Sequence, residues 1–546
     1  MKKILILSMA IAMMLFSCKN KSGEQTDQEP VTDYNAMVAD YAEVTLEADI
    51  SHLTDNEKEM LKTMFQIADI MDDLFWVQAY GDKEQLLAGI ENEDAKKFVM
   101  INYGPWDRLS DLAPFIDGFG AKPAGANFYP VDMTKEEFDA WDNADKTSLY
   151  TMIRRGEDGK LQAIWYKDFF KVEIAKVIEL LKKAAELAED PGMKNYLLKR
   201  ADAFLTDEYL ESDLAWMEMK TSNIDFICGP TENYEDGLFG YKAAYESFIL
   251  IKDLEWSAKL DKFAKLLPEL QKGLPVDAKY KKEMPGADSD MNVYQAVYYA
   301  GDCNAGSKTI AINLPNDERV HVAKGTRKLQ LKNSMQAKFD KILLPISNIL
   351  IAKEQRKHVK FDAFFENVMF HEVAHGMGVK TVVGQNIAVR KALKEAYSPI
   401  EEAKADIMGL YLVFKLYEMG ELNSGEVMDN FVTFVAGIFR SVRFGAASSH
   451  GKANMMRFNY FMEQGAISRQ QDGTYFVDFD KTRDAMISSV TMILTIQGDG
   501  DYQRAVELIE NEGVIKAELQ SDLDRLADEK IPVDIVFKKG PSYLGL

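Results

Sequence analysis

The sequence predicts an α+β fold that is predominantly helical. The chain has 546 residues, enough for more than one domain, and its hydrophobic fraction of 47% is ordinary for a globular protein. Most of its long apolar patterns repeat with the helical period, whereas the strand-like stretches are few and short. We find no internal repeat of the kind that predicts a solenoid. These observations together favour a helical architecture with a minor β component.

Residues 1–17 are predicted to be a secretion signal rather than part of the fold. Lys2 and Lys3 precede an apolar run, Ile4 to Phe16, that is too short to span a bilayer comfortably. The run ends in Leu15-Phe16-Ser17-Cys18, which resembles the bacterial lipobox. That resemblance implies that Cys18 is acylated and becomes the N-terminus of an exported protein, anchored to the membrane of the bacterial cell envelope. The alternative is an ordinary cleaved signal peptide.

Residues 18–40 are expected to form a flexible tether, because residues 19–33 are polar and lack periodicity. No later apolar run reaches the length of a transmembrane helix. After Cys18 the chain contains only two further cysteines, Cys228 and Cys303. Two thiols do not make a disulfide framework, so they are expected either to pair or to stay buried and free.

The net charge of −22 bears on the class of partner. It argues against nucleic acid, whose phosphates require a basic surface. It favours solubility and mildly favours cationic groups such as the free amine of a peptide. The alternative is simply a solvated acidic surface.

Ordered structure is expected to begin between Tyr34 and Thr45. Thr54 and Glu57 then form a capping-box pattern, which predicts the start of a long helix. Apolar residues at helical spacing continue it: Met60, Leu61, Met64, Ile67, Ala68 and Leu74. A second helix is expected from about Lys167 to Ala188, and a third after Pro191-Gly192. Strand-like patterns occupy residues 161–166, 309–314 and 533–537.

The strongest chemical signal is His371-Glu372-Val373-Ala374-His375, which follows the apolar, helix-compatible run from Phe361 to Phe370. Residues four apart share one face of a helix, so the two imidazoles can bind one Zn²⁺. Glu372 can then act on a metal-bound water. The alternative is a surface helix with two idle histidines.

A catalytic zinc site needs a third protein ligand, and Glu401-Glu402-Ala403-Lys404-Ala405-Asp406 can supply it. Glu402 is expected to ligate zinc from a facing helix. Glu401 and Asp406 are expected to support the ligands, since Asp406 can accept a hydrogen bond from the free ring nitrogen of a ligating histidine. An acidic cluster that only caps a helix is the alternative.

The two motifs together resemble the dipeptidyl peptidase III family of zinc exopeptidases. The resemblance implies one Zn²⁺ per chain, held by His371, His375 and Glu402. The family's usual first motif is His-Glu-x-x-Gly-His, whereas this chain has the five-residue form followed by Gly376. That shorter form resembles a subgroup with shorter bacterial members and a domain of some plant Nudix-containing proteins, although we find no Nudix box here.

Two further segments resemble the family in the same order along the chain. Gly229 to Asp236 is similar to its Glu-x-Tyr-x-Asp segment. By that likeness Glu232 binds the substrate's α-amine and Tyr234 stabilises the oxyanion. Ile312-Asn313-Leu314-Pro315-Asn316 resembles its Ile-Asn-x-Pro-Asn, which implies that Asn313 and Asn316 bind the peptide backbone. A polar loop and a Pro/Asn turn are the alternatives.

Ser449-His450-Gly451 resembles the family's downstream histidine segment, which implies that His450 stabilises the tetrahedral intermediate. Many members place an arginine four residues after this histidine, where this chain has Asn454, although Arg457 lies one helical turn beyond. A structural role for His450 is the alternative.

The family fold implies two lobes that flank a wide cleft. The mixed lobe, with a small β core, is expected from residues 41–250, joined by about 290–330 and 525–546. The helical zinc-binding lobe is expected from residues 251–289 and 331–524.

The resemblance implies an exopeptidase that hydrolyses oligopeptides and releases N-terminal dipeptides. A zinc aminopeptidase or oligopeptidase of another cutting pattern and a non-catalytic peptide-binding lipoprotein are the alternatives. The oligomeric state and the natural peptide are left open by the sequence.

Overall fold

The computed structural model describes residues 32–283 and 289–546. The predicted signal peptide, Cys18 and the first part of the expected tether lie outside these ranges. Within them, we find no helix that combines the length and the apolar character needed to cross a membrane.

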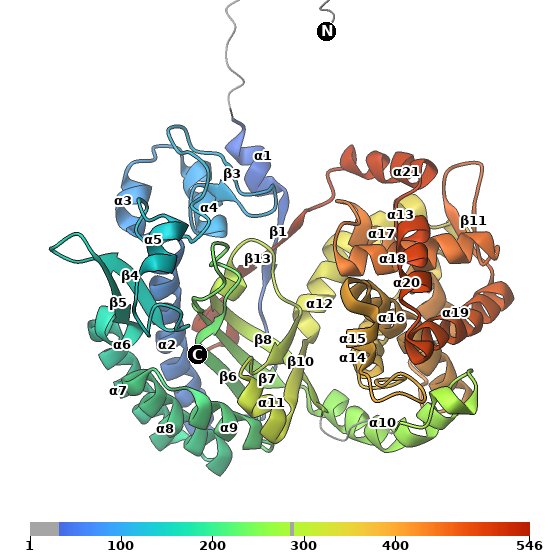
Figure 1. Cartoon of the computed structure of the whole chain (residues 1–546), viewed down its shortest axis with the longest axis horizontal. Coiled ribbons are helices and arrows are strands. Elements are labelled where there is room, and N and C mark those ends of the chain that lie inside the picture. Colours follow the sequence, from blue (N-terminus) through green and yellow to red (C-terminus); the bar gives the residue numbers. More distant parts are fainter. Residues whose placement is uncertain (1–31, 284–288) are drawn as a thin grey trace, which may run out of the picture. The chain divides into compact units, whose positions relative to one another are not determined.

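A five-stranded sheet forms the centre of the mixed lobe (Figure 1). Its strands, in spatial order, are β6 (Ile224–Glu232), β7 (Ala244–Lys252), β8 (Ser289–Gly301), β10 (Thr326–Leu331) and β9 (Ala311–Leu314). Strand β10 is parallel to β8, and the other neighbouring pairs are antiparallel. Nearly all of β6 and β7 is buried, so both faces of these strands contribute to the core.

Helix α2 (Asp55–Ala79) packs against β7 and β8, and α7 (Lys171–Leu187) packs on α2. The predicted capping box at the start of α2 is confirmed, because Thr54 and Glu57 exchange the expected side-chain and backbone hydrogen bonds. The remaining helices of this lobe are α1 (Tyr34–Ala39), α3 (Lys83–Ala88), α4 (Glu93–Asn102), α5 (Lys135–Ala140), α6 (Tyr166–Phe169), α8 (Pro191–Thr206), α9 (Leu210–Glu218) and α11 (Glu318–Lys324).

The predicted helix over residues 167–188 is divided at Phe170 into α6 and α7. Pro191 begins α8 at its first turn, where Asp190 caps the helix by accepting from the Met193 N–H at 2.8 Å. A proline fits this position because its missing N–H would have had no helical partner.

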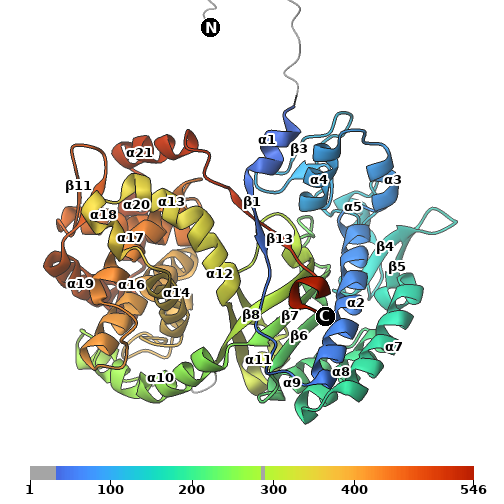
Figure 2. The same cartoon turned by 180° about the vertical axis from the view of Figure 1, so that it is seen from behind.

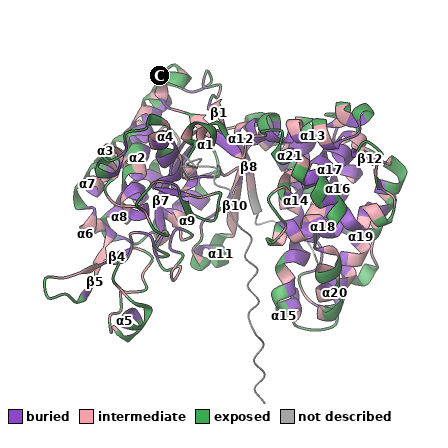
Figure 3. Ribbon diagram, turned by 90° about the horizontal axis from the view of Figure 1, so that it is seen from above, coloured by how far each residue is buried: buried purple, intermediate pink, exposed green. Residues whose placement is uncertain are grey.

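The helical lobe is built around a second core. Its helices are α10 (Leu254–Lys272), α12 (Lys332–Lys338), α13 (Leu344–Leu350), α14 (Phe361–His375), α15 (Val389–Leu393), α16 (Tyr397–Glu418), α17 (Val427–Val442), α18 (Ser449–Glu463), α19 (Phe479–Asp499), α20 (Tyr502–Glu512) and α21 (Ala517–Ala527). Figure 3 shows buried residues gathered inside each lobe, with α16 and α17 deep in the helical one. The predominantly helical α+β architecture predicted from the sequence is confirmed.

The sheet continues directly into the helical lobe at two points. Strand β7 ends one residue before the N-cap of α10, and β10 ends immediately before α12. Figure 1 shows β10 leading into α12, so the end of this strand is fixed to the start of the helical lobe.

Four two-stranded pairs complete the fold: β1 (Tyr41–Thr45) with β13 (Asp534–Lys538), β2 (Trp106–Asp107) with β3 (Ala113–Pro114), β4 (Thr151–Arg155) with β5 (Leu161–Trp165), and β11 (Ile467–Arg469) with β12 (Tyr475–Val477). The parallel pair β1–β13 brings the two ends of the described chain side by side (Figure 2). Each of the three predicted strand-like segments forms a strand, as β5, β9 and β13. Cys228 and Cys303 are both buried and free.

Candidate active site

Two helices of the helical lobe carry the motifs singled out in the sequence. His371 and His375 lie on the last two turns of α14, and Glu401, Glu402 and Asp406 lie on the first half of α16. The two helices pack closely because α16 has Gly409 at their crossing. A Cβ placed there would lie 2.7 Å from the backbone nitrogen of His371. The glycine therefore lets the ligand-bearing faces approach each other.

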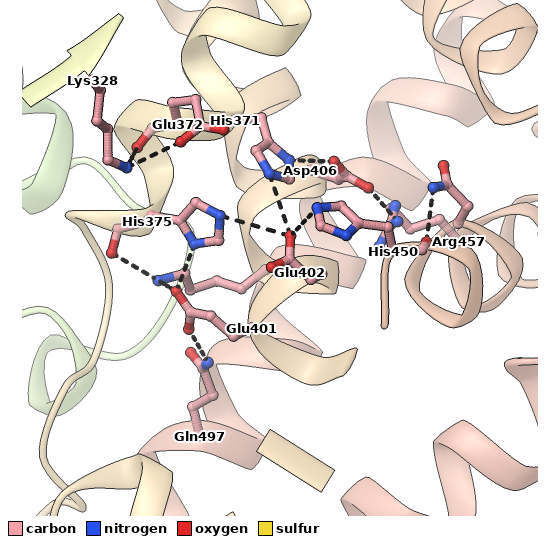
Figure 4. Close-up of polar contacts among 12 residues, drawn as sticks. Lys328, His371, Glu372, His375, Glu401, Glu402, Asp406, His450, Arg457 and Gln497 are labelled. Carbon is pink, nitrogen blue, oxygen red and sulfur yellow. Dashed lines mark hydrogen bonds and ion pairs between the residues drawn. The ribbon is translucent and has the colours of Figure 1, made fainter. Parts of the chain in front are cut away.

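One carboxylate oxygen, Glu402 Oε2, stands among three imidazole nitrogens (Figure 4). It lies 3.3 Å from Nε2 of His371, 3.7 Å from Nε2 of His375 and 3.2 Å from Nε2 of His450. This oxygen is buried, yet it makes no hydrogen bond of acceptable geometry. Such an isolated buried acceptor is costly unless something else, such as a cation, satisfies it.

The other nitrogen of each α14 histidine is already engaged. Nδ1 of His371 bonds Asp406, and Nδ1 of His375 lies 3.0 Å from Glu401 Oε1. Each carboxylate is in turn held by a buried cation: Asp406 pairs with Arg457, and Glu401 pairs with Lys404 at 2.7 Å. These contacts direct both Nε2 atoms toward Glu402, which is how outer residues orient metal-binding histidines.

The residues present fit a zinc ion. Two ligands that each lie about 2.0–2.1 Å from a tetrahedral zinc are roughly 3.3 Å apart. The separations of Glu402 Oε2 from the two α14 imidazoles, 3.3 and 3.7 Å, are close to this value. Burial lowers the pKa of His371, but the Asp406 carboxylate outweighs it and raises this pKa to about 10. A metal must therefore displace a proton from this imidazole in order to bind.

Glu372 lies beside this cluster and contacts the sheet of the mixed lobe through Lys328. Lys328, on β10, places its Nζ 3.1 Å from Glu372 Oε2 and 3.1 Å from the Glu372 carbonyl oxygen. Burial raises the pKa of Glu372, whereas the positive charges of Lys328 and of the neighbouring histidines lower it by a larger amount. The pKa of Glu372 is therefore lowered overall. The carboxylate is therefore held in its ionised, proton-accepting form.

The three predicted substrate-binding residues, and Tyr234, which is predicted to stabilise the oxyanion, lie on or next to the sheet. Glu232 ends β6 and is half-buried, Asn313 and Asn316 are exposed on and after β9, and Tyr234 has 83% of its surface exposed. The Asn316 amide donates to the Thr231 carbonyl at 3.1 Å. Burial raises the pKa of Glu232, an effect that a hydrogen bond from Asn316 partly offsets.

Lys328 links these residues to the helical lobe, because it is directly opposite Asn313 in the β9–β10 pair. Side chains of opposed residues in antiparallel strands lie on one face, roughly 5 Å apart at Cβ. One face of the sheet thus presents a predicted peptide-binding residue and a cation bound to Glu372.

His450 lies on the first turn of α18, and its side chain is 64% exposed. Its ring stacks on that of His371, with the two ring centroids 6.1 Å apart.

Some functional positions were not singled out by sequence reasoning. The sequence patterns assigned no role to Lys328, Lys404 or Gln497. Gln497 donates to Glu401 at 2.9 Å. Gly409 was also not predicted, because a single glycine in a helix does not indicate a helix crossing. Arg457 is buried against Asp406, so its role is to support this carboxylate. The roles of Lys328 and Gln497 depend on contacts between segments far apart in the chain, which no local pattern encodes, whereas Lys404 pairs with Glu401 within one helix.

The closeness of α14 and α16 gives a first prediction. Gly409→Ala is expected to lower stability by about 1–3 kcal/mol and to weaken metal binding, because the new methyl meets backbone atoms that cannot move aside. Thermal unfolding and competition with a chromogenic chelator measure the two effects.

The matched control is Gly437→Ala on α17, where a Cβ would have no neighbour within 4 Å. This change is expected to leave metal binding intact and to add up to about 1 kcal/mol of helix stability. Equal behaviour of the two variants would contradict the assigned role of Gly409.

Comparison with known proteins places this geometry in a family. The model of Peptidase family M49 matches residues 143–386, which include His371, Glu372 and His375. The chain is 37% identical over 560 residues to Nudix hydrolase 3 of Arabidopsis thaliana, a match that covers 91% of this chain and 72% of that protein.

Two solved structures are similar over nearly their whole length. Dipeptidyl peptidase III (DPP III) from Caldithrix abyssi has 42% identity and a TM-score of 0.87, with 92% of this chain and 98% of that chain covered. Dipeptidyl peptidase III from Corallococcus sp. strain EGB has 38% identity and a TM-score of 0.75, with 92% and 96% covered. With the His371, His375 and Glu402 cluster in place, these matches show that the chain belongs to peptidase family M49 and is a metallopeptidase of the DPP III type.

Proposed function

We propose that the protein is a zinc-dependent exopeptidase that releases dipeptides from the N-terminus of oligopeptides. The observation that carries the metal assignment is the buried Glu402 Oε2, which has no hydrogen-bond partner and stands among the Nε2 atoms of His371, His375 and His450. The similarity to two DPP III structures supports the cutting pattern. A zinc ion held by His371, His375 and Glu402 would supply Lewis-acid activation of water and of the scissile carbonyl.

Glu372 is the general base in this proposal. It accepts a proton from the attacking water and later delivers it to the leaving amine. Its carboxylate is ionised because Lys328 stabilises the negative charge. His450 and Tyr234 are assigned to the developing oxyanion as hydrogen-bond donors.

The mixed lobe binds the amino terminus. Glu232 would pair with the substrate ammonium, a charge-assisted contact that is strengthened by its half-buried position. Asn313 and Asn316 present amides to the peptide backbone from β9 and the turn after it. Anchoring the free amine at a fixed distance from the metal would set the cut after the second residue.

Lys328→Met tests how the base is tuned. Removing the ammonium is expected to raise the pKa of Glu372, because the charge of Lys328 helps to lower it. Since the base must be deprotonated, the acid limb of the kcat/KM profile should then move to higher pH. The matched control is Lys332→Met. Lys332 begins the adjacent helix α12 and pairs with Asp253 at 3.0 Å. An acid limb that is unchanged by Lys328→Met would argue against this role.

The cutting pattern is tested by digesting a free-amine pentapeptide with residues 19–546 and analysing the products by mass spectrometry. We expect release of an N-terminal dipeptide, loss of activity in Glu372→Gln and after chelation, and recovery on adding Zn²⁺. An N-acetylated copy of the peptide should be cleaved poorly, because Glu232 then lacks its ammonium partner. Elemental analysis of the purified protein identifies the metal that it carries.

Other products would change the proposal in defined ways. Release of single residues would indicate an aminopeptidase, and cleavage of the acetylated peptide at the same rate would indicate an oligopeptidase. Either result would retain the metal chemistry and remove the dipeptidyl assignment.

We further propose that the protein is exported and anchored to the bacterial cell envelope by a lipid on Cys18, the residue that ends the lipobox-like segment. The full-length protein is expected in the membrane fraction, and Cys18→Ala in the soluble fraction. Cys228→Ala, which removes a buried thiol instead, should stay in the membrane fraction. Membrane partition of Cys18→Ala equal to that of the parent would remove the anchor from the proposal.

A further inference from the structure

A pocket lies in the mixed lobe between α8, α9, the end of β6 and the turn that leads from β9 into α11. Its volume is about 350 Å³, which is enough for a small organic molecule. Figure 1 shows the elements around it, and α9 contacts both α8 and α11. Of the described residues that line this pocket, none belongs to the metal cluster, and none is Glu232, Asn313 or Tyr234. The pocket is therefore distinct from the metal and from the residue assigned to the peptide amine.

Aromatic rings form much of the pocket wall. They belong to Tyr150, Tyr196, Tyr209 and Trp216. The last three are almost completely buried, and the ring centroids of Tyr150 and Tyr209 lie 4.8 Å apart. The indole N–H of Trp216 is already used, because it donates to Asp225 at 2.8 Å. Such a wall favours a flat, apolar group inside the pocket.

An ion pair stands in the same wall. The Nη2 atom of Arg200 donates to Oδ1 of Asp213 at 2.7 Å, and the two side chains are 10% and 16% exposed. The Nε atom of Arg200 and the hydroxyl of Tyr209 are buried without a hydrogen-bond partner. An unused charged donor in a buried place is costly, so this guanidinium favours a further acceptor such as a carboxylate.

The Asp213 carboxylate favours a further cation. Among the described residues, its side chain accepts a hydrogen bond only from Arg200. Burial raises the pKa of Asp213 by more than the charge of Arg200 lowers it, so the negative charge is incompletely compensated. The other charged residues of the wall are Asp317 and Arg319, which pair with each other at 2.6 Å, and Glu318, which is exposed. The pocket thus offers a cation and an anion side by side, which suits a zwitterion.

The amine of the substrate does not account for this second site. A peptide has one α-ammonium, which the proposed function assigns to Glu232, a residue outside the pocket. The pocket nevertheless borders the amine site, because Thr231 and Asn316 both line it. The Asn316 amide donates to the Thr231 carbonyl at 3.1 Å and also bonds Glu232. A molecule in the pocket would therefore contact a residue that supports Glu232 without occupying its place.

We propose that this pocket binds a free aromatic amino acid. The α-ammonium pairs with Asp213, the carboxylate pairs with Arg200, and the ring packs among the aromatic residues of the wall. Each part of the ligand thus meets a group of matching chemistry. This inference goes beyond the proposed function, because it gives the protein a second ligand and does not depend on where peptides are cut.

The test is binding of L-phenylalanine to the purified protein, measured by isothermal titration calorimetry and by tryptophan fluorescence, since Trp216 lines the pocket. We expect a dissociation constant of roughly 1 mM or below. N-acetyl-phenylalanine lacks the ammonium and phenylalanine amide lacks the carboxylate, so each should bind about tenfold more weakly. L-Leucine, which lacks the ring, should also bind more weakly. This series uses the parent protein alone.

Asp213→Asn is the main variant, because it removes the charge and keeps an acceptor for Arg200. It should weaken the binding of L-phenylalanine about tenfold. The matched control is Glu211→Gln, at an exposed position of the same helix α9 outside the pocket, which should leave binding unchanged. If Asp213→Asn does not fold, Tyr150→Leu takes its place, and it should weaken the binding of phenylalanine more than that of leucine.

Two further measurements locate the ligand. Binding should persist in Glu232→Gln and after the metal is removed with a chelator, because neither the amine site nor the metal takes part. L-Phenylalanine should also bind to Glu372→Gln that is saturated with a free-amine peptide, since the two ligands occupy different places.

The outcomes separate this inference from the proposed function. Absence of binding up to about 10 mM would overturn the site, as would equal binding of phenylalanine and its three analogues. Loss of binding in Glu232→Gln, or mutual exclusion with the peptide, would also overturn it and would place the amino acid on the substrate-binding face. Failure of the proposed function would instead appear as a lack of dipeptide release by a protein that still binds phenylalanine.

Discussion

The close crossing of α14 and α16 is the constraint on which the active site depends. Two helices can bring His371 and Glu402 within 3.3 Å only if their backbones meet without side chains between them, and Gly409 provides that contact. The same crossing aligns Asp406 with His371 and Glu401 with His375. Two buried cations, Arg457 on α18 and Lys404 on α16 itself, then fix these carboxylates. The metal-binding geometry is thus a property of helix packing rather than of any single motif.

A second constraint joins the two lobes. Lys328 contacts Glu372 from the sheet, and its strand continues into α12 without a loop. Glu372, the proposed base, is therefore held by an ion pair to the lobe that carries the predicted peptide-binding residues, with Asn313 opposite Lys328 in the sheet. Under the proposed function, one strand couples the position of the substrate to that of the base. A shift of β10 relative to α14 would change both the ionisation of Glu372 and its distance from a bound peptide.

Burial of charge recurs through the functional region, and it is balanced differently at each place. Around the metal cluster both supporting carboxylates, Asp406 and Glu401, pair with buried cations, so neither charge is left uncompensated. Glu235, behind Tyr234, is likewise held by Arg108 and Lys122. At the end of α17, Arg440 and Arg443 share the nearby Asp534 carboxylate, which also pairs with Lys338.

The sequence by itself determined the helical character of the fold, the capping box of α2, three strands and the candidate ligands His371, His375 and Glu402, because these depend on spacing along one helix or strand. It left out the central strands β6, β7 and β8, since strands buried on both faces lack the alternation that identifies them. It also left out Lys328 and Gly409. Only the tertiary structure decided these, because each depends on which distant segments lie side by side, and packing rather than local periodicity sets that choice.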